Sequence, residues 1–158
     1  MSHRRLAAFT VASIPGNERT AIAKVQEAVS SLGLPRDTLD RLGTAVGETV
    51  MNAIEHGHHN QADLLVEVEV QEEKGRLFVI IRDHGGAPTG TSVEPDLDLK
   101  LDGEQTPRGW GLFLIRHMVD EMTVETVGTE HTVRLVIEPE GRSTRPGAPA
   151  GGRQEEKL

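Results

Sequence analysis

The hydrophobic positions of this chain follow a helical period in its first part. Apolar residues recur every three or four positions from Glu18 to Leu32, and again from about Asp37 to His56. A glycine follows each segment, Gly33 after the first and Gly57 after the second, where a helix commonly ends. We therefore predict two amphipathic helices over these ranges.

A two-residue period then replaces the helical one. Leu64, Val66, Val68 and Val70 alternate with Leu65, Glu67, Glu69 and Gln71, which predicts a strand with one buried face. Leu77–Ile81 is continuously apolar, so we expect this strand in the middle of a sheet with both faces covered. The remaining predicted elements are strands at Leu6–Ser13, Thr123–Val127 and Thr132–Ile137, and a third helix at Gly109–Met122.

The order of these elements predicts the fold class. Strands that are adjacent in sequence favour antiparallel pairing, so we expect an α+β two-layer sandwich, with helices on one face of a mixed, mostly antiparallel sheet. Residues 84–108 have no hydrophobic period and contain seven Gly or Pro, and so long a loop inside a compact domain is usually functional. We place one domain at residues 1–138 and a disordered tail at residues 139–158.

Composition and charge narrow the classes of function. The 158 residues suffice for one core, and 17 Lys+Arg against 25 Asp+Glu give a formal net charge of −8. A nucleic-acid binder needs a basic face, so this balance speaks against one. Cysteine is absent, which excludes disulfides and thiolate chemistry, and no apolar run is long enough to predict a membrane span. We expect a cytoplasmic protein.

A polar stripe on the second predicted helix is the first candidate for chemistry. At about 100° per residue, Glu48, Asn52 and Glu55 fall within about 60° of one another, opposite the apolar arc, and His56 lies beside them. The stripe thus offers carboxylates, an amide and an imidazole in successive turns. An ordinary solvated helix face is the alternative at this point.

Two glycine-containing segments are further candidates. Asp83 ends the buried strand and is followed within three residues by two glycines, which would let a ligand approach the backbone; a simple turn is the alternative. Gly109 and Gly111 open the third helix behind Arg108, where backbone N–H groups and the helix dipole favour an anion. Each signal is weak when taken alone.

Taken in order, these segments resemble the GHKL ATPases. Glu-x-x-x-Asn on a helix, Asp-x-Gly at a strand end, a long loop and Gly-x-Gly at a helix start are similar to the N box, G1 box, lid and G2 box of the Bergerat ATP-binding fold. The short lid and small size look most like the bacterial anti-sigma factor/serine-protein kinases of the RsbW and SpoIIAB type. The resemblance spans about Leu6 to Ile137, and GETVMNAIEHGH and GWGLFLIRHMVDEM are its most specific stretches.

The resemblance implies ATP and Mg²⁺ as cofactors and a role for each matched residue of the N box. Asn52 would ligate Mg²⁺ through its amide oxygen, the ligand type that a hard cation prefers. Glu48, one helical turn earlier, would be the catalytic base that takes the proton of the attacking hydroxyl. His56, at the end of the N-box match, joins the nucleotide-binding set.

The resemblance also assigns residues to the base and to the phosphates. Asp83 would accept a hydrogen bond from the adenine amino group, and Gly85 would let the base approach. Thr132 would bond toward the adenine edge. The residues that would hold phosphates at the start of the third helix are Arg108, Gly109 and Gly111.

Two departures from the family pattern concern the adenine pocket. The family's Asp-x-Gly-x-Gly reads Asp83-His84-Gly85-Gly86-Ala87 here, so the second glycine is displaced by one position. The family's Gly-Thr lies two residues early, at Gly128-Thr129, and Glu130-His131 directly precedes Thr132. Neither departure touches the predicted base or the predicted magnesium ligand.

The resemblance implies an anti-sigma factor that is also a serine-protein kinase. Such a protein silences a sigma factor, phosphorylates a serine on a small anti-anti-sigma (STAS-type) protein, and is commonly a homodimer, with no direct nucleic-acid or membrane partner. One alternative is a non-catalytic nucleotide- or partner-binding module of the same fold, which the displaced glycine favours. An ATP-binding fragment of a sensor histidine kinase ranks last, because no helical hairpin with a phospho-accepting histidine precedes the first strand.

A cluster of histidines after the second helix has a separate interpretation. His56, His58 and His59 follow one another closely, and His84 could lie near them. His-x-His-His can bind Zn²⁺, but no cysteine and no well-spaced fourth ligand accompany it. A solvated cluster at the helix C-terminus, where cations suit the helix dipole, is the favoured interpretation.

Overall fold

A computed structural model describes residues 4–85 and 107–139 of the chain, with side chains from Phe113 onward in the second range. Most of the predicted long loop, and all of the predicted tail beyond Pro139, lie outside the described residues. No helix in the described ranges is long and apolar enough to cross a membrane.

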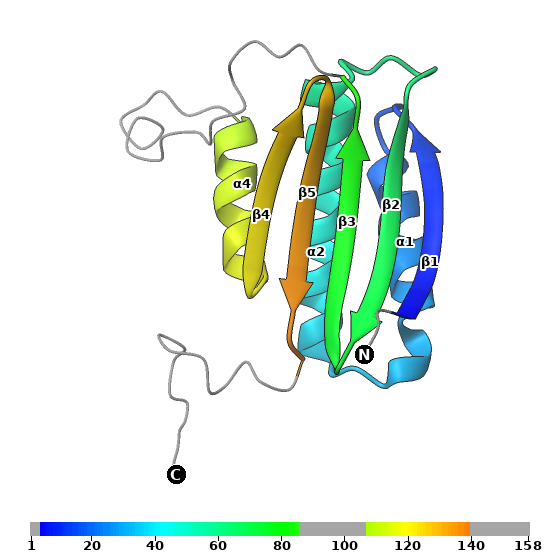
Figure 1. Ribbon diagram of the computed structural model, residues 1–158, viewed down its shortest axis with the longest axis vertical. Helices are drawn as coiled ribbons and strands as arrows, with labels where there is room; N and C mark the ends of the chain where they lie inside the picture. Colours follow the sequence, from blue (N-terminus) through cyan, green and yellow to red (C-terminus); the bar gives the residue numbers. More distant parts are fainter. Residues whose placement is uncertain (1–3, 86–106, 140–158) are drawn as a thin grey trace.

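Five strands form one sheet in the order β1-β2-β3-β5-β4 (Figure 1). Every neighbouring pair in this sheet is antiparallel, which confirms the expected pairing. β3 occupies the centre, as the continuous apolar run predicted. The strand bounds are β1 Arg4–Ala12, β2 Leu65–Glu73, β3 Arg76–Asp83, β4 Glu121–Val127 and β5 Glu130–Ile137.

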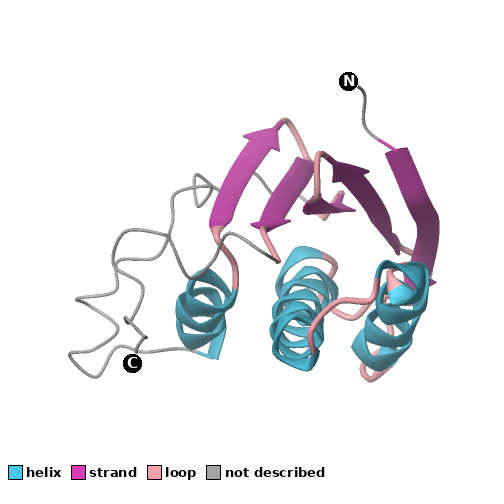
Figure 2. Ribbon diagram, turned by 90° about the horizontal axis from the view of Figure 1, so that it is seen from below, coloured by secondary structure: helices cyan, strands magenta, loops and turns pink. Residues whose placement is uncertain are grey.

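The helices cover one face of this sheet (Figure 2), so the predicted two-layer α+β architecture is confirmed. They are α1 (Asn17–Ala28), α2 (Arg36–Asn52) and α4 (Pro107–Met118), and α2 lies between the other two. A single 3₁₀ turn (Ser30–Leu32) follows α1 and ends at Gly33 with φ 64°, the left-handed conformation expected of a helix-ending glycine. α2 continues into a π-helical turn, Ala53–Gly57.

The core lies between α2 and the inner face of the sheet. Leu42, Val46 and Val50 of α2 are fully buried, and they belong to the same apolar cluster as Val79 and Ile81 of β3. This is the arc that the helical period predicted, and its burial fixes the rotation of α2 about its axis. The opposite side of α2, which carries Glu48, therefore faces away from the sheet, while Asn52 lies at the border between the two sides and reaches the end of β3.

The outer face of β3 is covered by charged side chains and not by a second layer of helices. Phe78 is only 4% exposed there, because the guanidinium groups of Arg134 and Arg76 lie over its ring, 4.8 and 5.4 Å from the centroid. Long side chains of this kind bury apolar surface while their charges stay in water. Both faces of this strand are thus covered, as expected, but arginine side chains provide the cover on the outer face.

α4 ends earlier than the predicted helix, at Met118 in place of Met122. The guanidinium of Arg41, itself buried on α2, donates to the backbone oxygen of Met118 at 3.1 Å and so satisfies the end of α4. Two residues on, the backbone N–H of Asp120 donates to the oxygen of Val136 at 2.8 Å, and strand pairing begins. Val119 therefore packs in the core between the two elements, and Met122 and Val124 continue the core from β4.

Candidate functional site

Asp83 and the glycine-containing segments around it meet at one end of the sheet. Asp83 is the last residue of β3 and is 5% exposed. Gly57, the last residue of the π-helical turn, lies so close that a Cβ atom built on it would stand 2.7 Å from the carboxylate carbon of Asp83. A Cβ on Gly85 would overlap the backbone oxygen of Gly57. This corner thus requires glycine on both sides of the carboxylate.

The π-helical turn explains how α2 reaches this corner. The N–H of His58 donates to the oxygen of Ala53 at 2.8 Å, one residue beyond the usual helical partner. The N–H of Asn60 then donates to the oxygen of Ile54, also at 2.8 Å. The wider turn accommodates one extra residue, which places Gly57 against Asp83 and continues the chain toward β2. Such π-turns inside α-helices are frequent at functional sites.

Within the described residues, two polar groups contact the carboxylate of Asp83. The N–H of Gly85 donates to Oδ1 at 3.2 Å, and Nδ1 of His131 lies 3.4 Å from Oδ2. A carboxylate offers about four acceptor positions, so each oxygen can still accept a further hydrogen bond. Asp83 is therefore a held, largely buried acceptor that could receive a donor from a ligand.

The structure does not place Thr132 beside Asp83, and that prediction needs correction. Asp83 pairs with His131 across β3 and β5, and Thr132 pairs with Arg82. Because successive side chains of a strand point to opposite faces, Thr132 lies on the outer face of the sheet, while His131 and Val133 line the inner side. His131, which the sequence analysis did not assign to the site, occupies the position expected of Thr132.

A narrow pocket joins the end of α2 to this carboxylate. Its lining includes Asn52 and Thr49 from α2, Asp83 from β3, and His131 from β5. The predicted magnesium ligand and the predicted adenine acceptor, 31 positions apart in the sequence, thus share one pocket. An amide oxygen and a carboxylate are oxygen groups suited to a polar, cation-carrying ligand.

Glu48 lies one helical turn before Asn52, on the stripe of α2 that faces away from the sheet. Its carboxyl is partly buried, and this burial is the main reason that its pKa is raised above the usual value of 4.5. The nearby carboxylates of Glu55 and Glu18 raise the pKa of Glu48 further. A carboxylate with a raised pKa binds protons more strongly than an ordinary surface glutamate, which is the property a general base needs.

The histidine cluster does not form the arrangements that the sequence left open. His56 remains beside the stripe, with Nε2 at 3.9 Å from a carboxylate oxygen of Glu55. His58, by contrast, is 1% exposed, so it does not belong to a solvated cluster. Within residues 4–85 and 107–139, no three His, Cys, Asp or Glu side chains are grouped to hold a metal ion.

His58 is a component of the site's framework that the sequence analysis missed. Its Nδ1 lies 2.7 Å from Oγ of Ser13, and its Nε2 accepts the backbone N–H of His84 at 2.9 Å. The side chain therefore connects the end of β1 to the turn after β3. Nothing in a run of three polar residues distinguishes this histidine from its exposed neighbours, so only the fold identifies it.

The third group of predicted residues lies at the start of α4. The helix begins at Pro107, so Arg108, Gly109 and Gly111 all fall in its first turns. This start lies at the same end of the molecule as the end of β3 (Figure 1). The side chains of Arg108 and Trp110, and residues 86–106, lie outside the described part of the structure.

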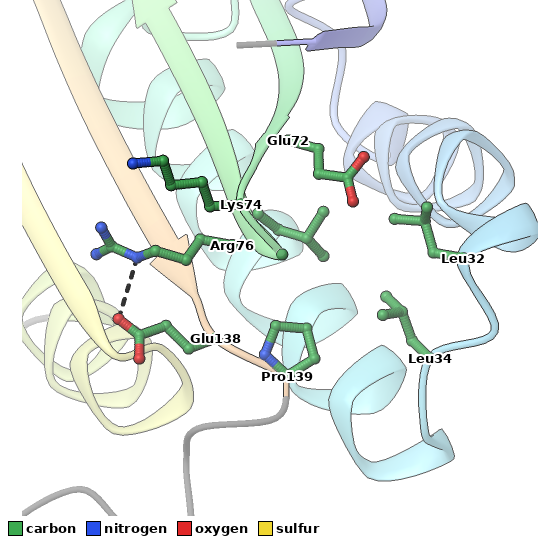
Figure 3. Close-up of a pocket in the computed structure, with 9 residues that line it drawn as sticks. Leu32, Leu34, Glu72, Lys74, Arg76, Glu138 and Pro139 are labelled. Atoms are coloured by element: carbon green, nitrogen blue, oxygen red, sulfur yellow. Dashed lines mark ion pairs between the residues drawn. The ribbon is translucent and has the colours of Figure 1, made fainter. Parts of the chain in front are cut away.

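A second hollow lies at the opposite end of the sheet, around the turn between β2 and β3 (Figure 3). Leu32, Leu34 and Pro139 line its apolar side, and an ion pair of 3.1 Å between Arg76 and Glu138 closes its polar side. None of the predicted site residues lines it. The predicted site residues thus lie away from this hollow.

Comparisons with known proteins show which family this chain is similar to. The family described as histidine kinase-like ATPase domain matches residues 11–137 of the chain. The anti-sigma F factor of Geobacillus stearothermophilus is 32% identical over 112 residues, covering 70% of this chain and 75% of that protein. The anti-sigma F factor of Priestia megaterium is 31% identical over 119 residues, covering 73% of this chain and 80% of that protein.

Solved structures show the same fold at lower identity. The structure of the RsbU and RsbW domains of Rv1364c from Mycobacterium tuberculosis matches with a TM-score of 0.60 at 18% identity. The match covers 87% of this chain and 32% of that one, so this chain corresponds to about a third of that protein. The SiaB-SiaC complex from Pseudomonas aeruginosa matches with a TM-score of 0.64 at 14% identity, over 85% of this chain and 90% of that one.

Proposed function

This chain belongs to the histidine kinase-like ATPase domain family, and on that premise we propose that it is an ATP-binding anti-sigma factor and serine-protein kinase. In this proposal it sequesters a sigma factor and phosphorylates a serine on an anti-anti-sigma antagonist of the STAS type. Family membership implies nucleotide binding. The similarity to two anti-sigma F factors supports the regulatory role, and the N-box residues support the catalytic one.

One observation carries the catalytic part of the proposal. Glu48, whose pKa is raised mainly by burial, stands one helical turn from Asn52, and Asn52 shares a pocket with Asp83. Asn52 and Asp83, the proposed ligand for a hard cation and the proposed acceptor for the adenine amino group, thus share one pocket. Glu48, the proposed general base, stands one turn earlier along α2. We do not expect an ordinary solvated helix face to combine a glutamate of raised pKa with an asparagine that shares a pocket with a buried carboxylate.

The residues present fit the two proposed cofactors. Asn52 would hold Mg²⁺ through its amide oxygen, since hard cations take oxygen ligands. Asp83 would accept a hydrogen bond from the adenine amino group, in a turn held by the close packing of Gly57 against Gly85 and against the Asp83 carboxylate. The phosphates would lie toward the first turn of α4, at Gly109 and Gly111. When bound, Mg²⁺ neutralises charge that develops on the transferred phosphoryl group.

Glu48 does the chemistry that the protein itself must supply. Its carboxylate accepts the proton of the substrate serine hydroxyl as the oxygen attacks, and the raised pKa makes it a better acceptor than an exposed glutamate. Phosphoryl transfer needs little covalent help beyond such a base and correct positioning. We propose in addition that the protein acts as a homodimer, which light scattering of the purified chain tests directly.

The decisive experiment measures phosphate transfer to the antagonist protein. The full chain would be mixed with radiolabelled ATP, Mg²⁺ and a STAS-type anti-anti-sigma protein from the same organism. We expect one serine of the antagonist to be labelled, and no labelling with Glu48→Gln. Label on a histidine, or none while a sigma factor is still bound, would contradict the kinase assignment.

A second candidate function is a non-catalytic module that binds nucleotide, or no nucleotide at all, and sequesters a partner. The contacts on Asp83 favour it, because both carboxylate oxygens already have a neighbour in the chain, Gly85 N–H and His131. Calorimetry separates the candidates. No heat of binding for MgATP at millimolar concentration, with a sigma factor still captured, would establish the module.

A further inference from the structure

The buried histidine His58 is the most completely built polar group outside the predicted site residues. Both ring nitrogens have partners, Ser13 Oγ at 2.7 Å and the backbone N–H of His84 at 2.9 Å. Ser13 is fully buried, and its own N–H donates to the oxygen of Leu64 at 3.1 Å. The buried imidazole thus connects three separate chain segments.

The contacts determine the protonation state that this arrangement needs. A backbone N–H can only donate, so Nε2 of His58 must present a lone pair to His84. The proton of the neutral ring then resides on Nδ1 and is donated to Ser13 Oγ. A second proton on Nε2 would set two donors against each other, and the contact with His84 would be lost.

The segment held by this contact is the one that carries the proposed nucleotide acceptor. His84 stands between Asp83 and Gly85, and Gly57, directly before His58, packs against the Asp83 carboxylate. We infer that His58 is a positioning residue that holds the Asp83–Gly85 turn in its nucleotide-binding geometry only while its imidazole is neutral. Acidification would release the turn and weaken nucleotide binding. The inference rests on the proposed nucleotide binding at Asp83.

The surroundings of His58 keep it neutral at ordinary pH. Burial is the main cause that lowers its pKa below 6.5, and the neighbouring His84 and His59 lower it further when charged. Asp83 opposes them by raising the pKa, and Ser13, on the β1 side, carries no charge. Farther out, Glu67 lies 3.2 Å from the His84 ring, and His131 lies 3.4 Å from Asp83. The switch therefore lies on the acid side of pH 6.5.

The test compares MgADP affinity at pH 7.5 and pH 5.5 by calorimetry on the full chain. The informative variant is His58→Gln, whose amide oxygen can accept the His84 N–H and does not titrate. The matched control is His59→Gln, because His59 is the exposed neighbour. Between pH 7.5 and pH 5.5, we expect the MgADP affinity of wild type and of His59→Gln to fall about tenfold more than that of His58→Gln. A tenfold difference corresponds to the loss of one hydrogen bond. Titration of the nucleotide itself is common to all three proteins.

A second measurement keeps the inference separate from the proposed function. ¹⁵N NMR of the wild-type imidazoles reports tautomer and protonation without nucleotide, and we expect His58 to carry its proton on Nδ1 at pH 7.5. A proton on Nε2, or an equal loss of affinity with pH in His58→Gln, would overturn the inference. If wild type binds no MgADP at either pH, the proposed function fails at once. If His58→Gln does not fold, two measurements on wild type replace it: the pH midpoint of His58 protonation from NMR and the pH midpoint of the affinity loss from calorimetry. We expect the two midpoints to coincide, and separate midpoints would overturn the inference.

Discussion

Gly57 lies directly against the carboxylate of Asp83, and a Cβ atom on Gly57 would stand 2.7 Å from both the carboxylate carbon and Oδ1. Gly57 is not among the residues with a positive φ, so its backbone does not require glycine. The lack of a side chain matters because Asp83 occupies the space that a side chain would fill. Glycine is therefore needed at position 57 because of its contact with Asp83, and not only because a helix ends there.

Gly57→Ala should displace Asp83 and weaken MgADP binding by tenfold or more, with a loss of about 1–3 kcal/mol in stability, the usual cost of overpacking. Calorimetry and urea unfolding would measure the two effects. Gly75→Ala is the matched control, because Gly75 has open space around it but a φ of 81°, so alanine there costs stability alone. Equal affinity in Gly57→Ala and wild type would show that the contact does not position Asp83.

Asp83→Asn should weaken MgADP or MgATP binding by about 1–3 kcal/mol. The substitution keeps the shape but removes the charge from a buried acceptor, so charge-assisted hydrogen bonds are lost. Asp63→Asn, on an exposed loop, is the control and should bind as wild type does. If Asp83→Asn binds the nucleotide with unchanged affinity, another residue of the chain must accept the hydrogen bond of the adenine amino group.

Glu48→Gln should abolish most phosphate transfer, a loss of about 10²–10⁴-fold, while nucleotide binding stays nearly intact. Glu27→Gln, on the exposed face of α1, is the control for removing a carboxylate and should transfer at the wild-type rate. A rate for Glu48→Gln equal to that of the control would refute the base assignment.

Glu48→Gln should also raise the melting temperature at pH 7. The pKa of Glu48 is raised in the folded protein, so folding favours the protonated carboxyl. The ionised form thus costs stability above the folded pKa, and the cost disappears below the unfolded value of 4.5. The gain should therefore shrink toward pH 4, and scanning calorimetry at both pH values checks the sign.

Folding stability should fall as the pH drops below about 6.5, through the depressed pKa of His58. A buried neutral histidine binds fewer protons than it does in the unfolded chain, so its contribution is complete above pH 6.5 and is lost on acidification. Urea unfolding of wild type and His58→Gln between pH 7.5 and 5.5 measures it. The variant should show the shallower pH dependence, and parallel curves would assign the effect to other groups.

Arg134→Ala should cost about 0.5–1.5 kcal/mol of stability, although the residue is on the surface. Its guanidinium lies 4.8 Å from the centroid of Phe78, whose ring would become exposed without it. Arg36→Ala, which breaks an exposed ion pair with Asp40 at 3.4 Å, should cost less than about 0.5 kcal/mol. Similar losses in the two variants would mean that Arg134 acts through its charge alone.

Local patterns in the sequence were sufficient for most of the fold. The helical period placed α2 and its buried arc, because burial of Leu42, Val46 and Val50 is a property of one helix against one sheet. The apolar run from Leu77 to Ile81 likewise identified the central strand. The end of α4 could not be predicted, since it depends on Arg41 reaching Met118 from 77 positions away.

By itself, the sequence determined the order of elements, the layer of helices and the stripe that holds Glu48 and Asn52, because short-range periodicity decides which side of an element is buried. Only the tertiary structure decided which side chains meet Asp83. The register between β3 and β5 brings His131 to Asp83 and turns Thr132 to the outer face, and a shift of one residue would exchange them. Register, and the approach of Gly57 to Asp83, are set by contacts between distant segments, which no local pattern contains.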